Sequence, residues 1–421
     1  MQGKALPGFR DFYPEEAALR SFIFARWRGV AERYGFEEYD GPPLEPLDLY
    51  TQKSGDEIVG QLYEFTDKGE RRVALRPEMT PTLARMVGAR AQALKKPIRW
   101  FSIPQLFRYE RQQRGRLREH FQLNMDIIGE ASAGADAEVI AAAIDIMRAF
   151  GLGPKDVRVR VSDRRVLVAV LGRQGVRDPE VPGVLAALDK VERAPEHAQE
   201  LLAKALGGDA KRASAVLGAL GPTLQGRDLL ATPEAEALSE CVSRLGALGM
   251  AEFVDVDFRI VRGLAYYTGI VFELFDAAGS LRAICGGGRY DDLLKQVSGI
   301  DLPCVGFGMG DVVLGELLKE RGAFKPADAR LDAFVVSVGA DDVPVALDLV
   351  HTLRDGGLAV EYALKPQAVR KQLELAAARG ATRAVIIGPD ERKEGVAVVR
   401  DLNGGGERKV RLDALTAELA R

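Results

Sequence analysis

The chain has 421 residues, and at about 100–200 residues per domain this length suggests several domains rather than one. Hydrophobic residues make up 47% and charged residues 28% of the chain, a balance that is typical of globular proteins and disfavours a largely disordered or fibrous one. The 58 Lys and Arg nearly match the 61 Asp and Glu, so any binding of nucleic acid must depend on a local basic patch.

Cysteine is rare in this chain. The three cysteines, Cys241, Cys285 and Cys304, have no paired spacing, which argues against a disulfide framework, a zinc ribbon or a CxxC redox centre. No apolar run reaches the roughly 18 residues of a membrane helix, and the N-terminal segment contains no apolar stretch of signal-peptide length. We therefore expect a cytoplasmic protein that contacts no membrane and holds no structural metal.

The first predicted element is a long amphipathic helix from Pro14 to Tyr34, which Gly35 ends. Prolines in the next segment, residues 36–50, prevent a continued helix and favour extended chain. The amphipathic pattern fits two alternatives equally, a subunit interface or packing on the chain's own core. The apolar residues that recur at helical spacing are Leu19, Phe22, Ile23, Trp27, Val30 and Tyr34.

From residue 71 to residue 150 the pattern predicts alternating strands and helices. Two of the strands flank a long charged loop, which favours an antiparallel hairpin. A helix that Gly151 ends follows the second of these strands. The predicted elements are strands over 71–77, 98–110 and 120–129 and helices over 81–94 and 136–150.

The charged loop of this hairpin carries five arginines around Gly115. Guanidinium groups this close repel one another unless an anion neutralises them. Planar guanidinium groups match phosphate oxygens, and a loop that contains glycine can close over a nucleotide. A solvated surface hairpin is the alternative. The five residues are Arg108, Arg111, Arg114, Arg116 and Arg118.

Alternation in the two flanking strands favours the nucleotide. In the second strand Gln122, Asn124 and Asp126 fall on one face, while their apolar neighbours fall on the other. Arg108 and Glu110 share a face of the preceding strand by the same rule. One face of the predicted sheet is thus polar where a folded domain ordinarily buries apolar groups. This pattern predicts a ligand site.

Two further motifs are weaker signals when each is taken alone. RPEMT places Glu78 and Thr80 between a strand and a helix, where capping of the helix is the commoner role for such residues. Arg262 opens VRGLAYYTG, and the pattern predicts that Tyr266 and Tyr267 point to opposite faces of a strand.

The rest of the chain divides by composition. Residues 161–250 are rich in Ala and Leu and predict a helical insertion, and GGGRYD at 286–291 predicts a glycine-rich loop. The composition shifts toward a linker around residues 322–330. Alternating strands and helices then predict a separate small α/β domain over 331–421.

Five segments occur in the order typical of one family, and over essentially its whole length the chain resembles histidyl-tRNA synthetases, which are class II aminoacyl-tRNA synthetases. The resemblance implies an α+β fold, with an antiparallel-sheet catalytic domain, a helical insertion and a C-terminal α/β domain that resembles anticodon-binding domains. It divides the chain into a catalytic domain over 1–160 and 251–325, the insertion over 161–250 and the C-terminal domain over 331–421. The five segments are LYEFTDKGERRVALRPEMTPTLAR, FRYERQQRGRLREHFQ, VRGLAYYTGIVFE, GGGRYDDLL and PCVGFGMGDVVLGELL.

The resemblance also implies an activity and its participants. A histidine–tRNA ligase uses ATP, supplied with Mg²⁺, to form histidyl-adenylate, and then transfers histidine to tRNA(His). Family members of this kind are homodimers. The resemblance implies catalytic roles for Arg108 and Arg262 at the ATP α-phosphate. The implied ATP-binding residues are Arg108, Glu110, Arg116, His120 and Phe121, and the implied histidine-binding residues are Glu78, Thr80, Gln122, Asp126, Tyr267 and Tyr290.

The chain departs from the commonest family pattern in one motif. Where many members have Glu-Arg, it reads Asp311, Val312, Val313, so the arginine that usually clamps adenine and the γ-phosphate is absent. An organelle-type branch of the family reads much the same way. The sequence identifies no replacement for this arginine, although Arg289 and Lys295 are nearby cations.

Two other functions are compatible with the resemblance. The first is a catalytically inactive paralogue that binds histidine and regulates ATP phosphoribosyltransferase. That paralogue typically lacks the C-terminal domain, whereas residues 331–421 look intact here. The second is a tRNA-sensing module, which is usually fused to a kinase. A ligase is therefore the function that we expect.

Overall fold

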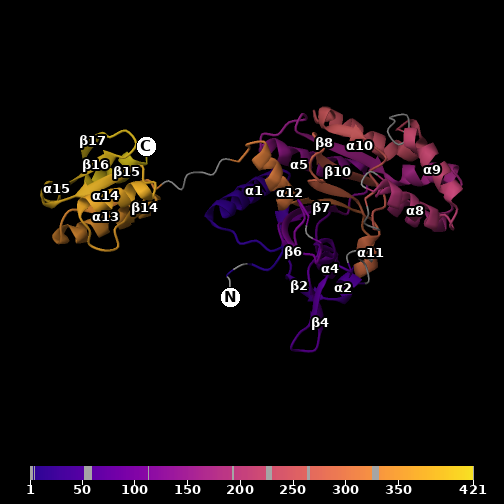
Figure 1. The fold of residues 1–421 in the computed structure, drawn as a ribbon, viewed down its shortest axis with the longest axis horizontal. Coiled ribbons are helices and arrows are strands. Elements are labelled where there is room, and N and C mark those ends of the chain that lie inside the picture. The colour runs from indigo at the N-terminus through magenta and orange to yellow at the C-terminus, as the bar shows by residue number, and fades with distance from the viewer. Residues whose placement is uncertain are drawn as a thin grey trace. The chain divides into compact units, whose positions relative to one another are not determined.

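The computed structural model describes residues 3, 5–51, 59–111, 113–191, 194–223, 230–262, 266–324 and 331–420. The chain divides into two compact units, residues 1–324 and 325–421 (Figure 1). The predicted linker lies partly outside the described residues. Within the described ranges, no helix is long and apolar enough to cross a membrane.

The first helix, α1 (Pro14–Arg33), packs on the core of its own unit. Proline at its first position and two glutamates in its first turn favour the start of a helix there. Ile23, Trp27 and Val30 are fully buried. They lie against α5 (Ala133–Ala149) and α12 (Asp311–Glu320), and these contacts realise the second of the two alternatives for this helix.

A large, mainly antiparallel sheet forms the centre of unit 1 (Figure 1). The described strands run in the order β1-β5-β7-β12-β11-β10-β8-β9, and β6 also pairs with β7. Parallel pairs occur at the two edges, between β1 and β5 and between β8 and β9. The strands are β1 (Glu37–Glu38), β5 (Ile98–Ser102), β6 (Gln105–Phe107), β7 (Glu119–Ile128), β8 (Val157–Asp163), β9 (Val254–Val256), β10 (Ile270–Asp276), β11 (Cys285–Arg289) and β12 (Cys304–Gly310).

The predicted hairpin around the arginine loop is present, with one difference. The single strand predicted over 98–110 is two strands, β5 and β6, and both pair antiparallel with β7. The interruption includes Pro104, which has no N–H to donate to a sheet. The arginine loop therefore connects β6 to β7 beside the middle of the large sheet.

The glycine-rich segment at 286–291 is not the predicted loop. Its first four residues belong to β11, which lies between β10 and β12. A Cβ atom on Gly287 would come within 2.4 Å of the carbonyl oxygen of Gly306 on the neighbouring strand. Glycine is thus required at this position because the neighbouring strand lies close, and not because the chain turns there.

Smaller elements and a group of helices complete unit 1. A three-stranded sheet, β2-β4-β3, precedes α4, and the helices of the predicted insertion begin at Arg164, directly after β8. Figure 1 shows α8 and α9 side by side at one end of this unit. The elements are β2 (Leu44–Pro46), α2 (Asp48–Thr51), β3 (Tyr63–Thr66), β4 (Arg72–Leu75), α4 (Thr80–Arg90), α6 (Arg164–Arg173), α7 (Val181–Leu188), α8 (Pro195–Ala205), α9 (Ala210–Thr223), α10 (Glu236–Ala247) and α11 (Leu293–Ser298).

Unit 2 is the α/β fold that the alternating pattern predicts. Its strands follow the order β14-β13-β15-β16-β17, with parallel pairs around β13 and antiparallel pairs beyond β15. A buried core of its own lies between the sheet and the helices. The elements are β13 (Ala333–Ser337), α13 (Val343–Asp355), β14 (Val360–Tyr362), α14 (Val369–Ala378), β15 (Arg383–Ile387), α15 (Pro389–Glu394), β16 (Val396–Asp401), β17 (Glu407–Arg411) and α16 (Leu415–Leu419).

Candidate active site

A cavity of about 370 Å³ opens over β7, β11 and β12 in unit 1. The cavity brings together residues from the RPEMT segment, the arginine loop, strand β7, the VRGLAYYTG segment and Tyr290. The site residues expected from the sequence lie around this one cavity, with the exception of Phe121. They are Glu78, Thr80, Arg108, Glu110, Arg116, His120, Gln122, Asp126, Arg262, Tyr267 and Tyr290.

The polar face of β7 forms the floor of the cavity. Gln122, Asn124 and Asp126 all line it, as the alternation predicts. The amide of Gln122 donates to Oδ1 of Asn124 at 2.8 Å, and Nε2 of His120 lies 3.4 Å from Oε1 of Gln122. These contacts fix the side chains side by side along the strand.

Phe121 lies on the opposite face of β7, and its expected place at the nucleotide is wrong. Its ring contacts Phe12 at 6.0 Å and Phe24 at 5.2 Å between centroids. Strand alternation turns it toward α1, away from its neighbours His120 and Gln122. The described residues therefore offer His120, not Phe121, to a ligand in the cavity.

Glycines on the neighbouring strands make room for this polar floor. Gly306 pairs with Asp126 in the sheet, and a Cβ there would lie 2.0 Å from Oδ1 of that aspartate. A Cβ on Gly308 would lie 2.2 Å from Nε2 of Gln122. Glycine at every second position, in a strand that pairs with a strand with a polar face, is a sequence signal that could have indicated this floor.

Two buried carboxyl groups meet tyrosines at one end of the cavity. Asp126 is 5% exposed and accepts a hydrogen bond from the hydroxyl of Tyr290, and Glu78 is 4% exposed and accepts one from Tyr266 at 3.2 Å. Burial raises the pKa of Asp126 to about 7, although the bond from Tyr290 opposes this change. This end of the cavity therefore suits a cation.

The tyrosine pair differs from its predicted geometry. Tyr266 and Tyr267 do not point to opposite faces of a strand, because residue 266 lies in a turn and both rings line the cavity. The ring centroids of Tyr266 and Tyr267 are 5.1 Å apart, and that of Tyr290 is 5.9 Å from that of Tyr266. The three rings form one aromatic wall.

The commoner interpretation of RPEMT, a capped helix, does not describe Glu78 and Thr80. Helix α4 begins at Thr80 with no side-chain capping bond. Glu78 instead faces Tyr266, and both residues line the cavity. The sequence correctly predicts that Glu78 and Thr80 lie between a strand and a helix, but the capping role that it favours is not the one that the structure shows.

Only two of the five arginines in the loop line the cavity, Arg108 and Arg116. An anion in this cavity can therefore neutralise these two arginines, but it is not the partner that relieves the repulsion among all five. Arg114 pairs with Glu316 at 3.1 Å and with Glu320, and Arg118 lies 4.1 Å from the ring centroid of Tyr109. The protein itself supplies partners for Arg114 and Arg118.

A hydrogen bond and an ion pair within the protein orient the two loop arginines that line the cavity. Nε of Arg108 donates to the carbonyl of Pro77 at 2.8 Å, and Arg116 forms an ion pair with Glu110. Burial, together with the charge of Arg108, lowers the pKa of His120 to about 3. This histidine is accordingly neutral near pH 7, and its ring can contact a ligand without adding charge.

Arg262 lines the cavity next to the ring of Tyr267 and has a strained backbone. Its φ of 61° lies in the left-handed region, which non-glycine residues rarely adopt. Nη1 donates to Glu273 at 2.6 Å, whereas the buried Nε has no partner among the described residues. Burial lowers the pKa of Arg262, but Tyr267 and Glu273 outweigh burial and raise it above its ordinary value. One nitrogen of a charged side chain that lines the cavity is thus left unsatisfied among the described residues.

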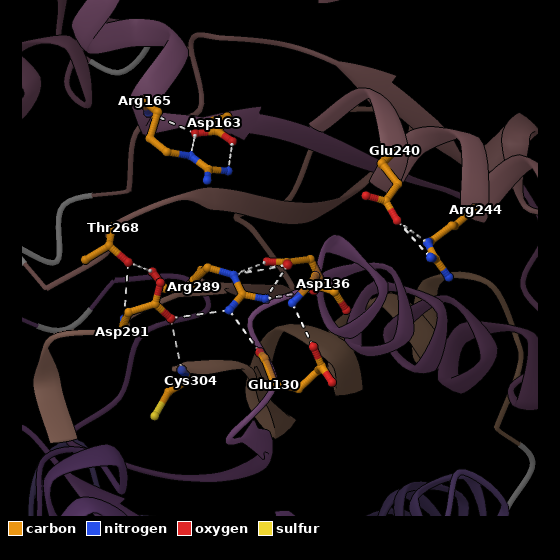
Figure 2. Close-up of polar contacts among 11 residues, drawn as sticks. Glu130, Asp136, Asp163, Arg165, Glu240, Arg244, Thr268, Arg289, Asp291 and Cys304 are labelled. Carbon is orange, nitrogen blue, oxygen red and sulfur yellow. Dashed lines mark hydrogen bonds and ion pairs between the residues drawn. The ribbon is translucent and has the colours of Figure 1, made fainter. Parts of the chain in front are cut away.

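A second arginine centre surrounds Arg289, the residue that precedes Tyr290 of the aromatic wall (Figure 2). Arg289 is 4% exposed and pairs with Asp136 of α5, with Nε–Oδ2 at 3.1 Å. It also donates to the carbonyl oxygens of Glu130 and Ser132, and Asp291 bonds to Arg289 and to the N–H of Cys304. This centre ties β11, β12 and α5 together directly beside Tyr290.

Neither cation that the sequence places near Val313 lines the cavity. Arg289 belongs to the buried centre just described, and Lys295 pairs with Asp301 at 2.8 Å. Arg282 and Asp189 do line it, and no sequence motif pointed to either residue. Among the described residues, no group of three or more His, Cys, Asp and Glu side chains could hold a metal ion.

Comparisons with known proteins agree with this arrangement. A family model described as "Histidyl-tRNA synthetase" matches residues 8–310, and one described as "Anticodon binding domain" matches residues 332–421. A "Histidine--tRNA ligase" of Opitutus terrae is 46% identical over 417 residues, covering 97% of this chain and 95% of the relative. A "Histidine--tRNA ligase, chloroplastic/mitochondrial" of Arabidopsis thaliana is 40% identical, covering 97% and 85%. The crystal structure of histidyl-tRNA synthetase from Nostoc sp. PCC 7120 covers 99% of its own chain and 100% of this one, with a TM-score of 0.79 and 25% identity.

Proposed function

Because this chain belongs to the histidyl-tRNA synthetase family and is a histidine–tRNA ligase that uses ATP, we propose that its cavity over β7 is where histidine and ATP react. One observation carries the proposal. The cavity has buried carboxyl groups and tyrosines at one end, and it also gathers Arg108, Arg116 and Arg262. An amino acid with a positive ammonium group and a nucleotide with negative phosphates match these two kinds of lining.

Histidine binds among the tyrosines. The carboxylates of Glu78 and Asp126 attract its ammonium group, with Thr80 and Gln122 beside them. Tyr267 and Tyr290 face the imidazole. A side chain without ring nitrogens would leave these buried polar groups without partners, which penalises it strongly.

ATP binds along the arginines. Arg108 and Arg262 hold the α-phosphate from two sides, while Glu110, Arg116 and the neutral His120 seat the rest of the nucleotide. Mg²⁺ arrives with ATP as part of the substrate and neutralises phosphate charge. The unpartnered Nε of Arg262 is satisfied when this phosphate is bound.

The reaction needs orientation and charge stabilisation more than proton transfer. The histidine carboxylate attacks the α-phosphorus, the bond to the bridging oxygen breaks, and pyrophosphate leaves with its electron pair. Charge grows on the phosphate oxygens during this step, and fixed guanidinium groups stabilise it. The terminal ribose hydroxyl of tRNA(His) then attacks the carbonyl carbon of the adenylate, and AMP leaves.

The chain divides into a catalytic domain, an insertion and a C-terminal domain that contacts tRNA(His). Residues 1–160 and 251–325 form the catalytic domain, residues 161–250 an insertion within it, and residues 331–421 the anticodon-binding domain. The active form is a homodimer in the cytoplasm. The presence of a C-terminal unit with its own core argues against the alternative role as a regulator of ATP phosphoribosyltransferase, which typically lacks it.

Pyrophosphate exchange tests the function directly. The purified protein should incorporate labelled pyrophosphate into ATP only when histidine is present, because exchange reverses adenylate formation. Histidine omitted from the same reaction serves as the control. Exchange no higher than background at saturating substrates, with histidine still bound, would support the regulator instead.

A further inference from the structure

We propose that Arg282 is a further ATP-binding residue, which holds the β- and γ-phosphates that leave as pyrophosphate. The inference rests on the proposed function, because it assigns a role within that ATP site. Arg282 precedes β11 and is half-buried, and it lines the cavity beside Arg116 and Val313. No sequence motif contains it.

Arg282 lies next to the tip of the arginine loop. Gly115 at that tip has a φ of 72°, which favours glycine. A Cβ there would lie 3.1 Å from Cγ2 of Val313 and 3.8 Å from Cδ of Arg282. The loop tip therefore lies between an apolar side chain and the stem of an arginine.

The guanidinium group of Arg282 lies against the flank of the same loop. Its Nη1 donates to Oε1 of Gln113 at 3.3 Å, and Gln113 pairs across the loop with Arg116. A long bond to a neutral amide is weaker than a charge-assisted bond to phosphate. A phosphate that reaches Arg282 therefore offers this guanidinium group a stronger contact than the bond to Gln113.

The charges in the cavity favour a further cation for ATP. Glu110 offsets the charge of Arg116, and Glu273 offsets that of Arg262. A triphosphate brings several negative charges to one place, and an arginine fork matches its oxygens in two-point contacts. Arg282 adds positive charge at the same cavity.

The location of Arg282 favours contact with the β- and γ-phosphates of ATP. Arg282 lines both the cavity and a neighbouring hollow of about 790 Å³, whose wall also contains three further arginines and two aspartates: Arg114, Arg158, Arg160, Asp255 and Asp276. The α-phosphorus must lie near the histidine carboxylate, where Arg108 and Arg262 hold the α-phosphate in the proposed site. The β- and γ-phosphates then extend toward the hollow, where pyrophosphate can leave.

The test compares Arg282→Gln and Arg282→Lys in the full-length protein. Exchange is measured as a function of ATP, pyrophosphate and histidine concentration, and binding of AMP and of an ATP analogue with a methylene α,β-bridge is measured by calorimetry. Arg244→Gln is the matched control, because Arg244 pairs with Glu240 on α10 and does not line the cavity (Figure 2).

We expect Arg282→Gln to raise the KM values for ATP and pyrophosphate about tenfold or more, because it removes a charge-assisted contact. The KM for histidine and the affinity for AMP should stay within about twofold, since neither ligand has β- or γ-phosphates. Arg282→Lys should recover part of the loss because it restores the charge. Arg244→Gln should behave as the unchanged protein.

Three outcomes would overturn the inference. In the first, Arg282→Gln leaves the KM for ATP unchanged. In the second, exchange by Arg282→Gln is normal while transfer to tRNA(His) falls, and this result would assign Arg282 to tRNA phosphates. Equal losses of histidine, AMP and ATP affinity would assign it a structural role. If the unchanged protein shows no exchange, the proposed function fails, and calorimetry with the ATP analogue still decides whether Arg282 binds its phosphates.

Discussion

Two arginine centres lie within unit 1, and they differ in how completely the protein satisfies them. Arg289 is buried with Asp136, two backbone carbonyls and Asp291 around its guanidinium group (Figure 2). Arg262 keeps a buried Nε without a described partner, and its backbone is strained. The comparison shows that two arginines near glycine-rich motifs can differ in how fully the protein satisfies their hydrogen bonds, and our proposal assigns the phosphate-binding role to the one with an unpartnered nitrogen.

The largest effect should come from Arg262. Replacing Arg262 with Ala should lower exchange by about 1,000-fold or more while the fold is kept, because the stabilisation of α-phosphate charge is lost. Exchange kinetics measure the loss and circular dichroism verifies the fold. Since the change also leaves the buried Glu273 unpaired, Arg262→Ala combined with Glu273→Gln controls for destabilisation. Activity retained in either variant would contradict the role of Arg262.

The matching change in the other centre should affect stability. Arg289→Met leaves Asp136 buried without its partner, which should lower the free energy of unfolding by about 3–5 kcal/mol. Chemical denaturation measures this value, and the KM for ATP of the remaining folded protein should be nearly unchanged. The double variant with Asp136→Leu should recover part of the stability. A loss of ATP affinity without a loss of stability would erase the distinction between the two centres.

A deletion extends the comparison to the two units. Since all lining residues of the cavity belong to residues 1–324, removal of residues 325–421 should leave exchange within several-fold of the full chain. Charging of tRNA(His) should fall by at least about tenfold, because contacts with the nucleic acid are lost. Parallel assays of the two steps measure this difference. Equal loss of both steps would count against the division of labour.

The smallest expected effect is a dependence on pH. The pKa of Asp126 is raised to about 7, so this carboxyl group is largely protonated at lower pH and attracts an ammonium group less strongly. The KM for histidine should therefore fall a few-fold as the pH rises from about 6 to about 8, and Asp126→Asn should flatten this profile. A steep profile that persists in Asp126→Asn would assign the titration to another group.

The same group makes a prediction for stability. Because the folded-state pKa of Asp126 lies above its unfolded value, the folded protein binds more protons between the two values. Its contribution to the free energy of unfolding should be present below about pH 4 and be lost as the pH rises through about 7. Unfolding titrations of the ligand-free protein and of Asp126→Asn should differ in this window, and identical curves would contradict the raised pKa.

The polar floor of the site could be predicted because its residues lie on one regular strand, whereas residues outside the strands, such as Glu78 and Arg262, were expected from the family resemblance. The polar face of β7 follows from a period of two, and the C-terminal α/β fold follows from alternating strands and helices. The partners of Arg114 could not be predicted, because Glu316 and Glu320 come close to it only through packing of α12. The strand within 286–291 was missed because its glycines are required by close packing against neighbouring strands, which the sequence does not show. Arg282 was missed because it belongs to no motif.

A crystal structure of the protein soaked with histidine and ATP would show whether the two compounds meet over β7. We expect a ligand in the cavity over β7, with its phosphates at Arg108 and Arg262 and its imidazole beside Tyr290. A cavity that stays empty at saturating concentrations of both compounds, or that the protein's own side chains fill, would contradict this expectation.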